Sequence, residues 1–158
     1  MVNFGTRSAV DPASSRHLRD AILSRHDVLR GLVAETVART DARALAETDL
    51  DGLRARVRRL YQTVDSYLAF EEQALPPALR DVIGWGTVLQ EQIEEDHRKL
   101  RVDLATALSA LEPQTLSWFK LASDVRAFAA ELLRDLDRED EALLNAQLDA
   151  IANDSEGG

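Results

Sequence analysis

The chain has 158 residues, of which 45% are hydrophobic and 30% are charged, so it can bury one substantial core as about one domain. Its formal net charge of -9 makes nucleic acid and anionic membrane surfaces poor partners, because both require a basic protein face. The absence of cysteine excludes disulfides, thiolate metal sites and cysteine nucleophiles. Any metal must therefore be held by oxygen and nitrogen ligands, which favours iron, manganese or zinc.

Helix-forming residues dominate the composition. Alanine, leucine, arginine and glutamate are abundant, whereas the chain has only seven glycines and four prolines. We therefore expect an all-α fold. Apolar runs stay short of the roughly 18 residues that span a membrane, and the first residues lack the apolar region of a signal peptide. The sequence predicts a soluble cytoplasmic protein with no membrane partner.

Capping residues, helix breakers and apolar periodicity divide the chain into four predicted helices. Ser14 or Ser15 can cap the first helix, and the Pro76-Pro77 pair should end the second. A local irregularity is expected in the fourth helix near Ser123. The expected helices cover residues 15–38, 51–77, 87–111 and 115–152, approximately, within a domain of residues 14–152 between an N-terminal arm of residues 1–13 and a disordered tail of residues 153–158.

Polar side chains recur inside the apolar stripes of the second and fourth helices. Tyr67 and Glu71 lie at i, i+4 spacing within the first of these stripes. Asp135 and Glu139 occupy the equivalent places 68 positions later. An unpaired carboxylate facing a dry core costs several kcal/mol unless a cation or a hydrogen-bond network takes up its charge. We therefore expect a cation or a polar network between these helices.

Histidines complete the repeat. His26 and His97 lie 71 positions apart, each on the apolar face of its helix, so the first helix matches the third. The rise of an α-helix places Glu71 and His97 at nearly the same level of two antiparallel helices. Two such helical hairpins related by a pseudo-twofold axis make an antiparallel, up-down-up-down four-helix bundle. One shared polar site inside that bundle is expected.

The residues around these positions resemble the hemerythrin-like (HHE) cation-binding family over about residues 15–150. The resemblance implies a non-haem centre of two irons per chain, with His26, Glu71, His97 and Glu139 at ligand positions. Tyr67 and Asp135 stand where the family pattern has histidine. The matching segments are His26 in Arg-His-Asp-Val-Leu-Arg, Glu71-Glu72-x-x-Leu75-x-Pro77, His97 in Asp-His-Arg-Lys-Leu, and Glu139-x-Glu141-x-x-Leu143. The implied metal set is His26, Tyr67, Glu71, His97, Asp135 and Glu139.

Phenolate and carboxylate are harder donors than imidazole, so this set would favour ferric over ferrous iron. The resemblance then implies a redox protein, such as a di-iron oxidase or a peroxide-decomposing protein, that reacts with dioxygen, peroxide or nitric oxide. A mixed manganese and iron centre, or zinc, is compatible with the same ligands.

The competing interpretation is a metal-free helical bundle that acts as a binding or regulatory module. In that case the histidines and glutamates neutralise one another through hydrogen bonds. The remaining acidic residues near the site are expected on solvated faces, and the oligomeric state is left open. These residues are Glu72, Glu94, Glu95, Asp96, Asp137, Asp140 and Glu141.

Overall fold

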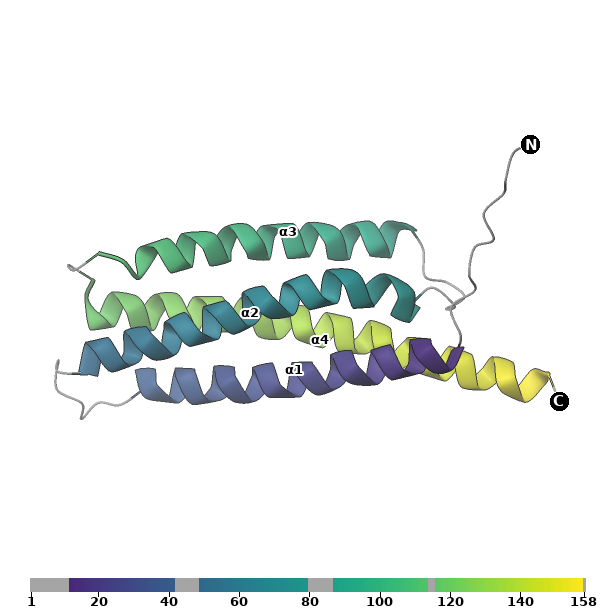
Figure 1. Ribbon diagram of the computed structural model, residues 1–158. Helices are drawn as coiled ribbons and strands as arrows, with labels where there is room; N and C mark the ends of the chain where they lie inside the picture. The colour runs from purple at the N-terminus through teal and green to yellow at the C-terminus, as the bar shows by residue number, and fades with distance from the viewer. Residues whose placement is uncertain (1–11, 42–48, 80–86, 114–115, 158) are drawn as a thin grey trace, which may run out of the picture.

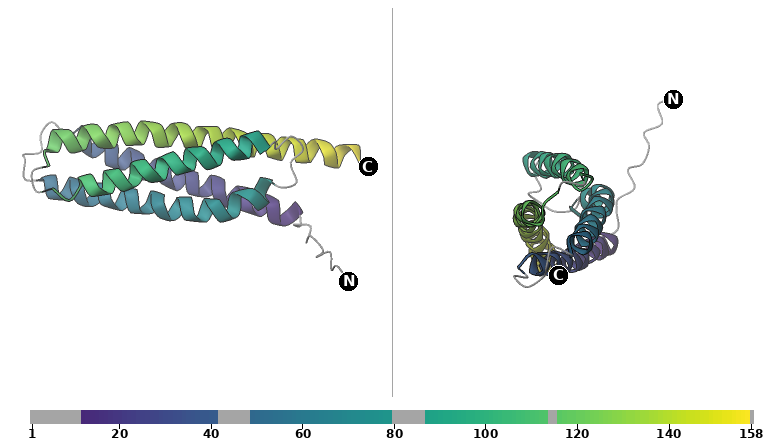
Figure 2. Two further views of the ribbon diagram at one scale, coloured as in Figure 1. Left: turned by 90° about the horizontal axis from the view of Figure 1, so that it is seen from above. Right: turned by 90° about the vertical axis from the view of Figure 1, so that its left-hand side faces the viewer.

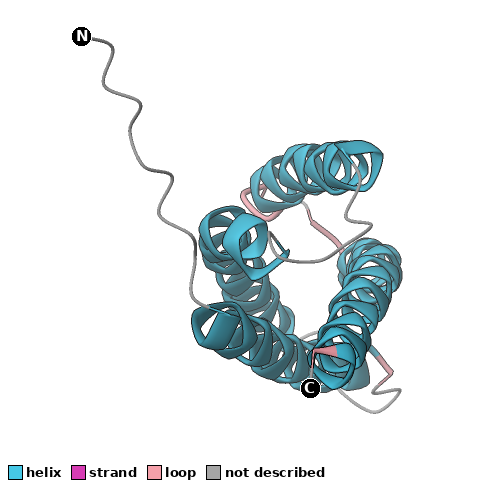
Figure 3. Ribbon diagram, turned by 90° about the vertical axis from the view of Figure 1, so that its right-hand side faces the viewer, coloured by secondary structure: helices cyan, strands magenta, loops and turns pink. Residues whose placement is uncertain are grey.

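Four antiparallel helices form a bundle in the computed structural model, which describes residues 12–41, 49–79, 87–113 and 116–157. Successive helices run in opposite directions (Figure 1), and the end-on view shows them arranged around one long axis (Figure 2). Throughout the described ranges the regular structure is helical (Figure 3), which confirms the predicted all-α, up-down-up-down fold. The helices are α1 (Pro12–Thr40), α2 (Leu50–Leu79), α3 (Thr87–Ala110) and α4 (Trp118–Glu156).

The apolar core is divided into two clusters along the bundle. The apolar stripes predicted for the second and fourth helices are buried, with every member at most 7% exposed. They consist of Val57, Leu60, Val64, Leu68 and Leu75 in α2, and of Val125, Phe128, Leu132, Leu136 and Leu143 in α4. A larger cluster takes residues from all four helices, whereas the smaller one is built from α1, α2 and α4, with Ile93 of α3 packed against it. The boundary between the two clusters lies between Ile22 and Leu29 in α1, between Leu68 and Ala74 in α2, and between Leu136 and Leu143 in α4.

The first two helices are longer than predicted. Helix α1 begins at Pro12, a residue type whose fixed φ suits the first helical position, so neither predicted serine is its cap. Instead, Ser15 is buried and its hydroxyl donates to the carbonyl oxygen of Pro77 at 3.2 Å. Arg19 donates to the carbonyl oxygen of Ala78 at 3.0 Å. These two side chains satisfy carbonyls at the end of α2, which continues past its prolines to Leu79.

Helix α4 differs from the prediction at both ends. It begins at Trp118, where the Ser117 side chain accepts a hydrogen bond from the backbone N–H of Lys120 at 3.1 Å. The helix is continuous through Ser123, so the expected irregularity is absent. It ends at Glu156 before Gly157, so part of the expected tail is helical. Proline and glycine, which would stop it earlier, are missing between Trp118 and Glu156.

The arm predicted at the N-terminus lies outside the described residues, except for the positions from 12 onward that belong to α1. Within the described ranges, none of the helices combines the length and the apolar character needed to cross a membrane.

Candidate metal centre

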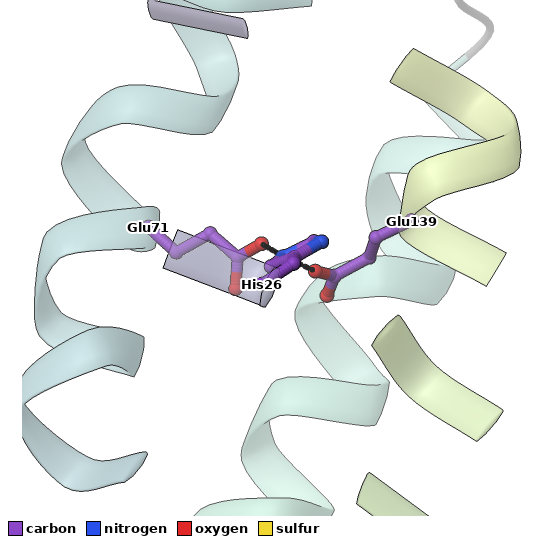
Figure 4. Close-up of side chains that lie close together, drawn as sticks. All are labelled: His26, Glu71 and Glu139. Carbon is purple, nitrogen blue, oxygen red and sulfur yellow. Dashed lines mark hydrogen bonds and ion pairs between the residues drawn. The ribbon is translucent and has the colours of Figure 1, made fainter. Parts of the chain in front are cut away.

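Two histidines and two glutamates form a buried layer across the bundle, at the break between the two apolar clusters. His26 comes from α1, Glu71 from α2, His97 from α3 and Glu139 from α4. Their exposed fractions are 0%, 1%, 6% and 6%, in that order. Figure 4 shows Glu71 and Glu139 reaching His26 from opposite sides. The structure thus brings together four side chains that the sequence placed on four separate helices.

Each glutamate contacts both histidines, using a different oxygen for each. Glu71 places Oε1 3.4 Å from Nε2 of His26 and Oε2 3.2 Å from Nε2 of His97. Glu139 places Oε2 3.2 Å from Nε2 of His26 and Oε1 2.8 Å from Nε2 of His97. The two carboxylates therefore bridge the two imidazoles, in an arrangement that repeats across the pseudo-twofold axis.

Tyr67 belongs to the same cluster. Its hydroxyl donates to Oε1 of Glu71 at 2.8 Å and also contacts Nε2 of His26. The phenol ring packs edge-on against the His26 ring, with 5.3 Å between the centroids. Burial, reinforced by the charges of Glu71 and Glu139, raises the pKa of Tyr67 far above its usual range. The phenol therefore keeps its proton unless a bound cation displaces it.

Asp135, the remaining predicted ligand, lies beside this layer and pairs with a different residue. Its Oδ1 is 2.5 Å from Nη2 of Arg138, and Nη1 of the same arginine is 3.3 Å from a carboxylate oxygen of Asp96. Burial raises the pKa of Asp135, although Arg138 opposes the shift. Of the six residues predicted as ligands, five meet in one place, and Asp135 faces the surface between α3 and α4.

Asp140 is a site residue that sequence reasoning assigned wrongly to a solvated face. Its Oδ1 contacts Nδ1 of His26, and its Oδ2 accepts a hydrogen bond from Nη2 of Arg30 at 2.6 Å. Arg30 also donates to Asp137 at 2.9 Å. One residue step rotates the side chain about 100° around α4, which turns Asp140 from the bundle axis toward α1. The overlooked signal was Arg30, which follows His26 by one helical turn.

Hydrogen bonding to the carboxylates decides the protonation of the histidines. Burial on its own lowers the pKa of His26, but the adjacent carboxylates of Glu139, Glu71 and Asp140 outweigh it and raise the pKa to about 10. For His97 burial is likewise outweighed by Glu139 and Glu71, and the pKa rises to about 10. Both imidazoles are therefore cationic near neutral pH in the metal-free protein.

The pKa values of the two glutamates shift in opposite directions, because the charge of one carboxylate affects the protonation of the other. Burial raises the pKa of Glu139 to about 7, and its hydrogen bond with Glu71 adds to that shift. Burial also disfavours the charged form of Glu71, but hydrogen bonds from Glu139, His26 and His97 prevail and lower its pKa. When no cation is bound, protons on the imidazoles therefore balance the negative charge of the carboxylates.

The nitrogen and oxygen atoms of this layer are arranged more suitably for binding a metal cation than for hydrogen bonding to one another. Nε2 of His26 has three oxygen neighbours, and Nε2 of His97 has two, although one N–H can point at only one acceptor. Consistent with this, the buried Oε2 atoms of Glu71 and Glu139 find no hydrogen-bond partner within the described part of the chain. Oxygen and nitrogen ligands at right angles around one small divalent cation lie about 3 Å apart, close to the separations in this layer.

Three of these residues, His26, Glu71 and Glu139, each offer one ligand atom such that all three atoms lie within 4.8 Å of one another. The contact of Asp140 with Nδ1 of His26 keeps a proton on that nitrogen, which leaves Nε2 to face the centre as a ligand. The layer therefore has the composition and spacing of a metal site with a supporting carboxylate behind one histidine.

In the chelated protein, the free energy of unfolding should fall by more than about 2 kcal/mol as pH rises from 6.5 toward 10. The folded histidines keep their protons in this range because their pKa values are raised, whereas the unfolded chain releases them near pH 6.5. The stabilisation is thus complete below pH 6.5 and lost as pH approaches 10. Urea unfolding at successive pH values measures it. A constant or rising stability would mean that the folded histidines are neutral.

Replacing Asp140 should weaken metal binding without unfolding the bundle. The change Asp140→Asn removes the negative charge behind His26, and loss of such an outer partner typically costs about 10-fold to 100-fold in metal affinity. Asp137→Asn is the matched control, because Asp137 contacts Arg30 without touching His26. Competition titrations against a chelator measure the affinity, and circular dichroism checks the fold. Equal affinities for the two variants would contradict a role for Asp140.

Comparison with known proteins agrees with this geometry. The chain matches the Hemerythrin HHE cation binding domain over residues 17–146, which includes parts of all four helices and every residue of the buried layer. Among curated proteins and solved structures, none matches significantly. The matched region covers most of the 158 residues, so the chain belongs to the hemerythrin HHE cation-binding domain family.

Proposed function

We propose that this protein holds a dinuclear non-haem metal centre, with two irons or one manganese and one iron, that reacts with dioxygen, peroxide or nitric oxide. The observation that supports the proposal is the double bridge of Glu71 and Glu139. Each carboxylate directs one oxygen to His26 and the other to His97. A carboxylate that reaches two imidazoles in this way is suited to span two neighbouring cations.

The chain would hold the metals with His26, Tyr67, Glu71, His97 and Glu139. Asp135 remains a proposed sixth ligand, and it would first have to leave its pair with Arg138. Iron, when bound, would supply one-electron redox chemistry and a position for a small ligand. The protein's own contribution is a buried layer between two apolar clusters, where charges interact strongly because they have little contact with water.

A metal-free binding module is the alternative, and one observation favours it. The cationic histidines and the glutamates already compensate one another through ion pairs of 2.8 to 3.4 Å. Such a layer can exist without a cation, although two buried carboxylate oxygens find no hydrogen-bond partner among the residues that the structure describes. The two functions differ in what the purified protein contains, so metal analysis separates them.

The purified or iron-reconstituted protein should contain about two irons per chain, and Glu71→Gln or Glu139→Gln should remove most of them. Glutamine preserves the shape of the side chain but is neutral, so it is a much weaker ligand. The matched controls are Glu72→Gln and Glu141→Gln, neighbouring exposed positions on the same two helices. Metal content by elemental analysis is the measurement. Iron-free parent protein that does not take up iron would support the metal-free module.

Tyr67→Phe should abolish a visible absorption band of the iron-loaded protein while the fold is retained. The expected band arises from tyrosinate bound to ferric iron, and the variant loses only the hydroxyl while its ring still fills the core. Tyr61→Phe is the control, because Tyr61 is another buried tyrosine of α2, packed on Phe128 in the larger cluster. Visible spectra of the three proteins at equal iron content test this. A band that survives in Tyr67→Phe would exclude Tyr67 as its source.

A further inference from the structure

The buried layer is reached from the surface on one side of the bundle. A cleft of about 410 Å³ lies between α2 and α3, and its inner lining includes Glu71 and His97. A second cleft of about 270 Å³, between α3 and α4, reaches Glu139. His26 lines neither cleft and is 0% exposed. The two histidine positions, equivalent in the repeat, therefore differ in access.

The difference arises from two related arginine–acid pairs. Arg30 binds Asp140 at 2.6 Å, and in the matching place Arg101 binds Glu72 at 2.8 Å. The first pair lies directly behind His26, because Asp140 also contacts that ring. In the second pair, both side chains line the larger cleft, where they accompany His97. The Arg30–Asp140 pair therefore covers His26, whereas the Arg101–Glu72 pair lies beside the cleft that leads to His97.

The lining of the larger cleft suits a molecule without charge. Leu75 and Pro76 of α2 and Ile93 of α3 form the apolar part of its wall. Its other lining residues are charged or titratable, namely Glu71, Glu72, Glu94, His97, Arg98 and Arg101. The two arginines at its rim already have acidic partners, since Arg101 pairs with Glu72 and Arg98 with Glu95. A charged ligand would lose hydration along the apolar wall without meeting an uncompensated opposite charge at the rim. An uncharged small molecule pays no such penalty.

We propose that the cleft between α2 and α3 is the route by which a small uncharged ligand reaches the metal centre, on the side of His97. This inference rests on the proposed function, because it assumes that the layer holds metal. The smaller cleft reaches the layer only at Glu139 and is lined by neither histidine, whereas the larger cleft is lined by both Glu71 and His97. Ile93 lines both clefts, so a larger side chain at this position would narrow both of them, whereas Pro76 lines only the larger one.

Nitric oxide association with the reduced, iron-loaded protein tests the route. Ile93→Trp should slow association about ten-fold, because the larger ring fills the cleft and raises the barrier to entry. Ile93→Ala should leave it equal or faster. Val102→Trp is the matched control, since Val102 lies on the same helix, is 62% exposed and does not line the cleft. Iron content and the spectrum at saturation should be unchanged in all three variants.

Pro76→Trp gives an independent obstruction from the opposite wall, in case the change at Ile93 disturbs folding. Pro76 is exposed and lines the cleft from α2. Slower association in this variant, at unchanged iron content, supports the route. Association as fast as in the parent for folded Pro76→Trp would overturn the inference while leaving the metal centre intact, because Pro76 lines only the larger cleft. A parent protein that binds no iron would instead refute the proposed function.

Discussion

The mutual compensation of two imidazoles and two carboxylates is the interaction on which this bundle depends. Each of the four helices contributes one of these groups, so the cluster joins all of them at a single level. An isolated buried charge would cost several kcal/mol, and removing one partner would leave the others uncompensated. Apolar clusters on both sides limit the contact of these charges with water, which strengthens the interactions within the layer.

Most of the fold could be predicted from helical periodicity, since the apolar stripes of α2 and α4 are the buried faces of those helices. The same periodicity placed His26, Glu71, His97 and Glu139 inward, because each lies in register with apolar neighbours. Helix ends were less predictable. The end of α2 depends on Ser15 and Arg19, which come from another helix and are distant in the sequence.

Asp140, which sequence reasoning assigned to a solvated face, and Asp135, which pairs with Arg138 and stays a proposed ligand, both lie at the boundary of the core face of α4. Helical periodicity shows whether a residue faces the core. It does not show which partner a residue at the boundary of that face will meet, because that depends on how the helices pack. Asp135 meets Arg138 of its own helix, whereas Asp140 meets Arg30 and His26 across the interface with α1. The sequence repeat matches Arg30 with Arg101 and Asp140 with Glu72. Considering these two pairs together would have indicated a role for Asp140, because Arg101 and Glu72 make the equivalent contact.

The two arginine–acid pairs also select how the hairpins dock. Arg30 of α1 binds α4, and Arg101 of α3 binds α2, so both pairs connect the first hairpin to the second. Sliding one hairpin by a helical turn, about 5.4 Å, would break both pairs and separate the buried glutamates from the histidine of the other hairpin. Uniform apolar stripes would tolerate such a shift far better. The polar layer and its flanking pairs therefore fix the register of the bundle, whichever cation it receives.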